Sequence, residues 1–221
     1  MDLTLKRVIA YLMDFLFITI LVSFIVNIKI INPYLDKYRD TYDEYNKLIT
    51  DVNENKLDTE SDEYKTKIVD LTYDLNKYRV VSASISSILF LGYFGVLQYI
   101  LKGQTLGKKI MKIKVTSVSD KKLNILNFLT RSVILNNILF SIILIVGVYV
   151  FNKNNYYNLS LIVYYIELLV MSLIVLMIVL RKDNRGLHEL ITNTKVVAVD
   201  ENSDVVIIKN PKNIEKNVKK K

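Results

Sequence analysis

Four long apolar segments dominate this sequence and limit the folds that it can adopt. They run approximately over residues 8–31, 80–101, 133–151 and 159–180. A helix needs about 20 mostly apolar residues to cross a hydrocarbon core ~30 Å thick. Buried helices of a soluble protein are the alternative, but four such segments in a chain of 221 residues favour membrane spans. We therefore predict an all-α polytopic membrane protein with four transmembrane helices.

The first apolar segment, residues 8–31, is not a cleavable signal peptide. It carries Asp14 within its apolar run and lacks a small-residue cleavage site. It is also longer than the apolar region of a signal peptide. We expect this segment to remain in the protein as the first span.

The distribution of Lys and Arg predicts the orientation of the spans. The loop 102–132 has eight basic residues and one acidic residue, and the tail 181–221 has ten basic residues. The loop 32–79 has eight basic but 12 acidic residues. Because short loops rich in Lys and Arg stay in the cytoplasm, both termini are predicted to be cytoplasmic, in a multi-pass protein of the cell membrane.

These assignments divide the chain into six parts. They are the cytoplasmic N-terminus with transmembrane helix 1 (1–31), an extracellular helical hairpin (32–79), transmembrane helix 2 (80–101), a basic cytoplasmic loop (102–132), transmembrane helices 3 and 4 (133–180), and a cytoplasmic tail (181–221). The last two spans are joined by only about seven residues, so they are expected to form a tight antiparallel pair.

The loop 32–79 has the helical period on both sides of a polar break at residues 53–61. Its aromatic and aliphatic residues recur every three or four positions, as in Tyr34, Tyr38, Tyr42 and Tyr45, and again in Tyr64, Ile68, Leu71 and Leu75. Ser61 before Asp62 is typical of a helix start. We predict an antiparallel helical hairpin. It either spaces two spans or docks an extracellular protein partner or lipid headgroups through its Tyr side chains.

The inner loop begins with KGQTLGKK, residues 102–109, which only superficially resembles a phosphate-binding loop. A P-loop has four residues between its glycines and a Ser or Thr after its Lys. Here three residues separate Gly103 from Gly107, and Lys109 follows Lys108. Nucleotide binding is therefore excluded.

Two cytoplasmic segments have the pattern of short β-strands. Ile113 and Val115 alternate with polar residues in the inner loop, and residues 194–199 and 205–209 flank a polar turn in the tail. We predict that these short cytoplasmic β-elements pair into a small sheet. The basic end of the tail, residues 216–221, is expected to be disordered and attracted to anionic lipids at the cytoplasmic face.

The composition excludes several classes of function. With no Cys and a single His (His188), the chain has no disulfides, no thiolate metal site and no multi-His metal centre. No cofactor motif is present, and we do not expect an enzyme. The net charge of +8 would suggest nucleic acid as a partner, but the basic residues fall in the predicted cytoplasmic loops, so the lipid bilayer explains them better.

Three segments together resemble the RDD family of bacterial membrane proteins. They are Arg7, Ala10 and Asp14; then Thr105, Gly107 and Lys108 before a strand; and last Arg185, Gly186, Leu187, His188 and Glu189 before Thr194 and Val196. The resemblance covers residues 9–31 with the preceding Arg and residues 80–199, without the long hairpin. It implies that Arg7, Asp14 and Glu189 are the family's motif residues, with Glu189 in place of the second Asp, and that the protein takes part in transport.

Two carboxylates lie inside predicted spans. A charge near the bilayer centre costs roughly 2.5–3.5 kcal/mol on insertion scales, so Asp14 and Glu167 each need a partner or a function. Arg7 shares the helix face of Asp14 but lies ~10 Å away along the axis, so Arg131 or Arg185 is the expected partner of Asp14. Glu167 is expected to pair with Asn136 or Asn137. The serines of the second span, Ser82, Ser84, Ser86 and Ser87, are expected to form a packing face.

Two functions remain open. In the first, Asp14 near the inner side and Glu167 nearer the outer side form a path for protons, small cations or a small solute, which a homodimer would help to enclose; His188 could also move protons. In the second, the protein is a non-transporting scaffold that recruits partners through its outer hairpin and basic inner face, and Asp14 locks helix packing.

Overall fold

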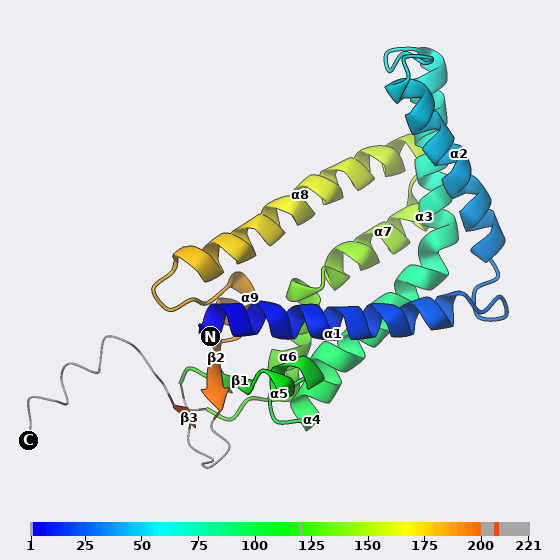
Figure 1. Ribbon diagram of the computed structural model, residues 1–221. Helices are drawn as coiled ribbons and strands as arrows, with labels where there is room; N and C mark the ends of the chain where they lie inside the picture. The colour runs from blue at the N-terminus through cyan, green and yellow to red at the C-terminus, as the bar shows by residue number, and fades with distance from the viewer. Residues whose placement is uncertain (1, 120, 200–205, 208–221) are drawn as a thin grey trace, which may run out of the picture.

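The computed structural model describes residues 2–119, 121–199 and 206–207, most of them in helices. The long helices are α1 (Leu3–Val26), α2 (Leu35–Asn53), α3 (Asp62–Leu91), α6 (Ile125–Leu135), α7 (Ile138–Val150) and α8 (Lys153–Leu180). The short elements are the π-helix η1 (Gly92–Leu97), α4 (Gln98–Ile100), α5 (Leu106–Ile110), α9 (Leu187–Ile191), β1 (Ile113–Ser117), β2 (Thr194–Val199) and β3 (Val206–Ile207). Figure 1 shows the tip of the α2–α3 hairpin at one end of the molecule, called the hairpin end, and the strands with α5 at the other, called the sheet end.

Three helices in the described part of the chain are long and apolar enough to cross a membrane. They are α1, the continuous helix Asp62–Ile100 that α3, η1 and α4 form together, and α8. Their large apolar side chains point outward, as Phe24 (72% exposed) and Leu180 (74% exposed) do. Lipid is as apolar as these side chains, so their exposure is favourable in a bilayer and unfavourable in water. The chain is therefore a multi-pass membrane protein.

The third predicted span is not a continuous helix. It consists of α6 and α7, which meet at an angle of 68°, so the number of spans rises from three to four only if this bent pair crosses as one. The break falls at Asn136 and Asn137, and Asn137 has a left-handed backbone with φ 55°. Asn tolerates that conformation better than most residues. The predicted third span, residues 133–151, therefore consists of the end of α6, the break and α7.

The α2–α3 hairpin confirms the predicted helical hairpin. Ser61 is the N-cap of α3 and accepts a hydrogen bond from the Tyr64 amide, 3.2 Å away. Leu48 and Ile68 are buried, and the ring of Tyr34 stacks on that of Tyr78 with centroids 6.0 Å apart. The hairpin continues into the membrane helix without a break, so it is a rigid extension of α3.

The predicted sheet is also present. β1 pairs antiparallel with β2, Ile113 opposite Ala198 and Ser117 opposite Thr194, and β2 pairs antiparallel with β3. Residues 200–204, the predicted turn, and residues 216–221, the predicted lipid-binding end, lie outside the described residues.

A buried core joins the sheet to the first helix. It consists of Ala10, Ile113, Val115, Phe128 and Val196. Ala10 comes from α1, Phe128 from α6, and the other three from the sheet. Because these segments lie far apart in the sequence, this core fixes α1, α6 and the sheet relative to one another, and the polar side chains described next lie around it.

Candidate functional site

Asp14 is fully buried and its carboxylate is held by donors from two other segments. Its Oδ1 accepts hydrogen bonds from the Tyr93 hydroxyl at 2.6 Å and from the Gly107 amide at 2.7 Å. Its Oδ2 accepts a hydrogen bond from the Thr105 hydroxyl, and the Lys108 ammonium lies 4.0 Å away. Three donors and one cation satisfy a carboxylate that would otherwise be costly to bury.

The inner-loop motif supplies these donors because it folds into a single helical turn, α5. Thr105 is the N-cap of α5 and accepts from the Lys108 amide, 3.4 Å away, so the turn directs its free amide groups toward Asp14. The Tyr93 hydroxyl also accepts from the Leu106 amide at 3.2 Å. Unpaired amides at a helix start are suited to an anion. The motif therefore caps a carboxylate of α1 rather than a phosphate.

Lys108 is nearly buried beside this carboxylate. Its ammonium lies 3.3 Å from the Thr105 hydroxyl and 5.6 Å from the centroid of the Phe94 ring. Burial lowers the pKa of the Lys108 ammonium to about 8; Asp14 opposes that shift, whereas Arg131 and Arg7 reinforce it.

Glu189 is fully buried and joins α9 to α1. Its Oε2 accepts a hydrogen bond from the Arg7 guanidinium at 2.5 Å and another from the Gly186 amide at 2.9 Å. Arg7 also donates to the carbonyl oxygen of Asn184. One arginine thus fastens the start of α1 to the turn before α9.

Arg131 approaches the same carboxylate from α6. Its guanidinium lies 3.8 Å from Oε1 of Glu189 and donates to the Thr194 hydroxyl. The Thr194 hydroxyl lies 2.9 Å from that of Thr192, at the start of β2. Glu189 is therefore the centre of a buried network that links α1, α6, α9 and the sheet.

The expected partners of Asp14 were wrong. Arg131 pairs with Glu189, and Arg185 pairs with Asp183 at 2.8 Å. Neither is among the groups that hold Asp14. Asp14 is held by two hydroxyls, one amide and one ammonium instead of the expected arginine, because the inner loop folds back onto α1.

His188 is buried beside Glu189. Its Nδ1 has no hydrogen-bond partner in the described structure, and its backbone carbonyl accepts from the Thr192 hydroxyl at 2.7 Å. Burial and the nearby cations Arg131 and Arg7 lower the pKa of His188 well below its ordinary value. The imidazole is therefore neutral at physiological pH.

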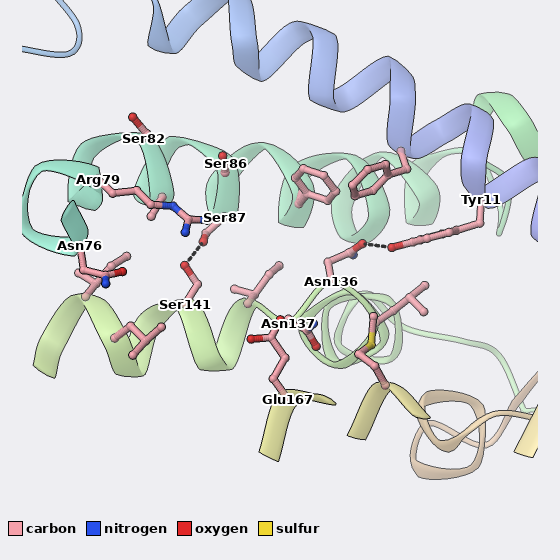
Figure 2. A pocket seen from close by; sticks show the side chains of 18 of the residues that line it. Tyr11, Asn76, Arg79, Ser82, Ser86, Ser87, Asn136, Asn137, Ser141 and Glu167 are labelled. Carbon is pink, nitrogen blue, oxygen red and sulfur yellow. Dashed lines mark hydrogen bonds between the residues drawn. The ribbon is translucent and has the colours of Figure 1, made fainter. Parts of the chain in front are cut away.

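A separate polar cavity of about 420 Å³ lies within the membrane helices, between α3 and α7 (Figure 2). Polar side chains line it along its length: Asn76, Arg79, Ser82, Ser86, Ser87, Ser141, Asn136, Asn137, Tyr156 and Glu167. Two of the serines bond across it, since the Ser87 hydroxyl lies 3.3 Å from that of Ser141. Of the four serines predicted to form a packing face, Ser82, Ser86 and Ser87 thus line the cavity, whereas Ser84 is not among the lining residues.

The broken helix forms the end of this cavity nearest the sheet. Asn137 donates from Nδ2 to Oε1 of Glu167 at 2.6 Å, which confirms one of the two expected partners of that carboxylate. The Tyr11 hydroxyl donates to Oδ1 of Asn136, 3.2 Å away (Figure 2). Tyr11 and Phe15 line the cavity, whereas Asp14 between them faces α5. The two predicted carboxylates therefore belong to different sites.

Three tyrosines in these sites, Tyr11, Tyr93 and Tyr156, were not predicted as site residues. Tyr93, which holds Asp14, lies in an apolar run where an aromatic residue is ordinary. Its only sequence signal is the nearby Gly95, a small residue that permits close packing. Gly95 faces Leu129 so closely that a Cβ there would stand 2.7 Å from its side chain. Tyr156, which lines the cavity, has no sequence signal that we recognise.

The RDD family model matches residues 3–193. The chain belongs to the RDD family. The match spans the α2–α3 hairpin, the first two motif segments and Arg185 to Glu189 of the third, and it ends one residue before Thr194. Comparisons with curated proteins and with solved structures gave no match.

The structure shows where the RDD motif residues lie and what they bind. Arg7 and Asp14 lie on one face of α1 and bind two segments from later in the chain: Arg7 binds Glu189 near α9, and Asp14 binds Thr105 and Gly107 of α5. In this RDD protein they gather the motif segments at the sheet end.

Proposed function

We propose that this RDD protein is a transporter for an ion or a small solute, located in the bacterial cell membrane with both termini in the cytoplasm. The observation that carries the proposal is the polar cavity between the membrane helices, with the carboxylate of Glu167 inside it. Polar and ionisable groups are expensive at membrane depth and mark the paths of solutes and ions.

The broken helix supports the same proposal. A helix interrupted inside the membrane leaves backbone groups unpaired, and such breaks are tolerated where they line a cavity. The break between α6 and α7 meets that condition, since Asn136 and Asn137 line the cavity.

The two carboxylates take different parts in this proposal. Glu167 lines the proposed path. Asp14 holds α5 against α1 and lies outside the cavity lining, so its part is to close and shape the sheet end.

The orientation rests on the charges of the sheet end. The loop 102–132 and the tail 181–221 carry 18 of the 30 basic residues, which favours the cytoplasmic side for them. We propose anionic lipid headgroups as their partners on that face.

The proposal is tested by flux into proteoliposomes. Internal pH is followed under imposed gradients of Na⁺, Li⁺ or K⁺, and uptake of labelled small solutes is measured in parallel. Native protein is expected to give flux above empty liposomes. Glu167→Gln, which keeps the size of the side chain, is expected to lose most of it at equal incorporation.

The matched control is Glu63→Gln. Glu63 lies on the exposed hairpin and pairs with Lys67, so this variant is expected to keep native flux. Absence of flux for every ion and solute would instead favour the scaffold function, with the hairpin as the place to seek a partner. Equal flux in native protein and Glu167→Gln would remove Glu167 from the path.

A further inference from the structure

Two opposite charges lie in the cavity wall and do not pair with each other, one on an exposed residue and one on a half-buried residue. Arg79 of α3 and Glu167 of α8 both line it. The carboxylate of Glu167 is bonded to the amide of Asn137. Within the described residues, the guanidinium of Arg79 has neither an ion pair nor a hydrogen bond. A guanidinium has five donors in a fixed fork that suits a carboxylate, so Arg79 is free to bind an anionic group.

Two buried polar atoms in the cavity wall also lack partners. They are the hydroxyl of Tyr156, whose side chain is 0% exposed, and Oδ1 of Asn137. Native proteins rarely leave buried polar atoms unsatisfied. The hydroxyl can donate to an anion, and the amide oxygen can accept only from a donor such as an ammonium group.

These groups are arranged by charge along the cavity. Tyr156 lies near the part of α3 that carries Arg79, since its ring centroid is 5.5 Å from that of Tyr73. Figure 2 shows the Arg79 side chain extending from α3 toward Ser87, while Glu167 and Asn137 lie together farther along. Ser87 bonds Ser141 of α7, which lies four residues after the N-cap Asn137, and four residues of helix rise ~6 Å. The cationic and anionic regions are therefore separated by a distance that a small molecule can span.

We propose that the cavity binds a small organic zwitterion, with its anionic group at Arg79 and Tyr156 and its cationic group at Glu167 and Asn137. This inference rests on the proposed function, because it names the substrate class of that site. The serines between the two regions supply hydroxyl groups for the middle of the ligand.

A bare cation fits the lining less well. Glu167 is the one carboxylate among the lining residues, and it already accepts a hydrogen bond from Asn137. In the part of the chain that the structure describes, no three His, Asp or Glu side chains gather as metal ligands do. A cation would also leave Arg79 facing it with the same charge, whereas a zwitterion satisfies both ends.

The test measures binding and not transport. Thermal unfolding and titration calorimetry of the purified protein in detergent are carried out with L-alanine and γ-aminobutyrate as zwitterions. L-Alanine methyl ester, which lacks the anionic group, and N-acetyl-L-alanine, which lacks the cationic group, are the comparison ligands. We expect at least one zwitterion to raise the unfolding temperature by several degrees, and neither comparison ligand to do so.

Variants then locate the binding. Arg79→Met and Glu167→Gln are each expected to weaken zwitterion binding about tenfold or more. Arg39→Met is the matched control, since Arg39 lies on α2 and bonds Asn27, away from the cavity lining. If a cavity variant does not fold, the four ligands on the native protein still decide the question.

Equal shifts from the ester and the zwitterions, or no shift from either zwitterion, would overturn the inference. Ion flux without zwitterion binding would also overturn the inference, but it would support the proposed transport function. Zwitterion binding without flux of any solute would sustain the inference and overturn transport.

Discussion

Gly107 lies so close to Ala10 that a Cβ on Gly107 would stand 2.3 Å from the Ala10 carbonyl oxygen. The same Cβ would stand 3.0 Å from the carboxylate of Asp14. The glycine of the RDD inner-loop motif therefore permits α5 to lie directly on the backbone of α1, where its amide can reach Asp14.

Gly107→Ala is predicted to destabilise the protein strongly. The contact is with backbone, which cannot move aside as a flexible side chain can, and overpacking typically costs about 1–3 kcal/mol. Thermal unfolding in detergent measures the effect. Gly92→Ala is the matched control, because a Cβ at Gly92 would meet nothing within 4 Å; an equal loss in both variants would contradict the explanation.

Tyr93→Phe is predicted to destabilise the protein without altering its packing. It removes the hydroxyl that donates to Asp14 and accepts from the Leu106 amide, leaving buried polar groups unsatisfied at a cost of about 1–3 kcal/mol. Tyr99→Phe, at an exposed tyrosine nearby on the same helix, is expected to have little effect. Unfolding temperatures of the two variants make the comparison.

Arg7 and Glu189 are predicted to be energetically coupled. Either single change, Arg7→Met or Glu189→Gln, leaves the other group buried with an unpaired charge or hydrogen-bonding group, which is costly. The loss of unfolding free energy in the double variant is therefore expected to be smaller than the sum of the losses in the two single variants, by about 1 kcal/mol or more. A double-mutant cycle of unfolding free energies measures this, and strict additivity would show that the contact contributes little.

Lys108 is predicted to make stability increase with pH between about 8 and 10.5. The folded pKa is about 8 and the ordinary value is 10.5, so in this window the unfolded chain binds a proton that the folded protein does not. Unfolding free energy then rises with pH, by at most about 1.4 kcal/mol per unit. Lys108→Met is expected to lose this slope, so the unfolding temperature of native protein minus that of the variant should grow between pH 7.5 and 9.5.

The sequence predicts the elements of this fold well because each of them has a local signal. Long apolar runs predict α1, α3 and α8, the period of Tyr34 to Leu75 predicts the hairpin, and alternation around Val115 predicts β1. The break at Asn137 has no comparable signal, since two asparagines in an apolar run are also compatible with a continuous span that buries them. The angle between α6 and α7 comes from a backbone conformation that only the structure shows.

In the candidate sites, the carboxylates could be predicted from the sequence, but most of their partners could not. Asp14 and Glu167 stand out because a carboxylate in an apolar run is costly wherever it lies. Their partners could not be predicted as well, because they depend on how distant segments fold back. Thr105 lies 91 positions from Asp14, and Glu189 lies 182 positions from Arg7. An asparagine could be predicted as the partner of Glu167, because few other polar residues lie at the same depth in the predicted spans.

The shortness of α7 has a consequence for the surrounding lipid. Its 13 residues rise ~20 Å, which is less than the ~30 Å of a typical hydrocarbon core. Ile142, Val146 and Tyr149 of this helix face outward, so acyl chains beside them must shorten or tilt to match it, and such mismatch thins a bilayer locally. Where α6 and α7 cross as one bent span, headgroups and water are therefore expected to lie closer to the helix break than to the middle of a full-length span.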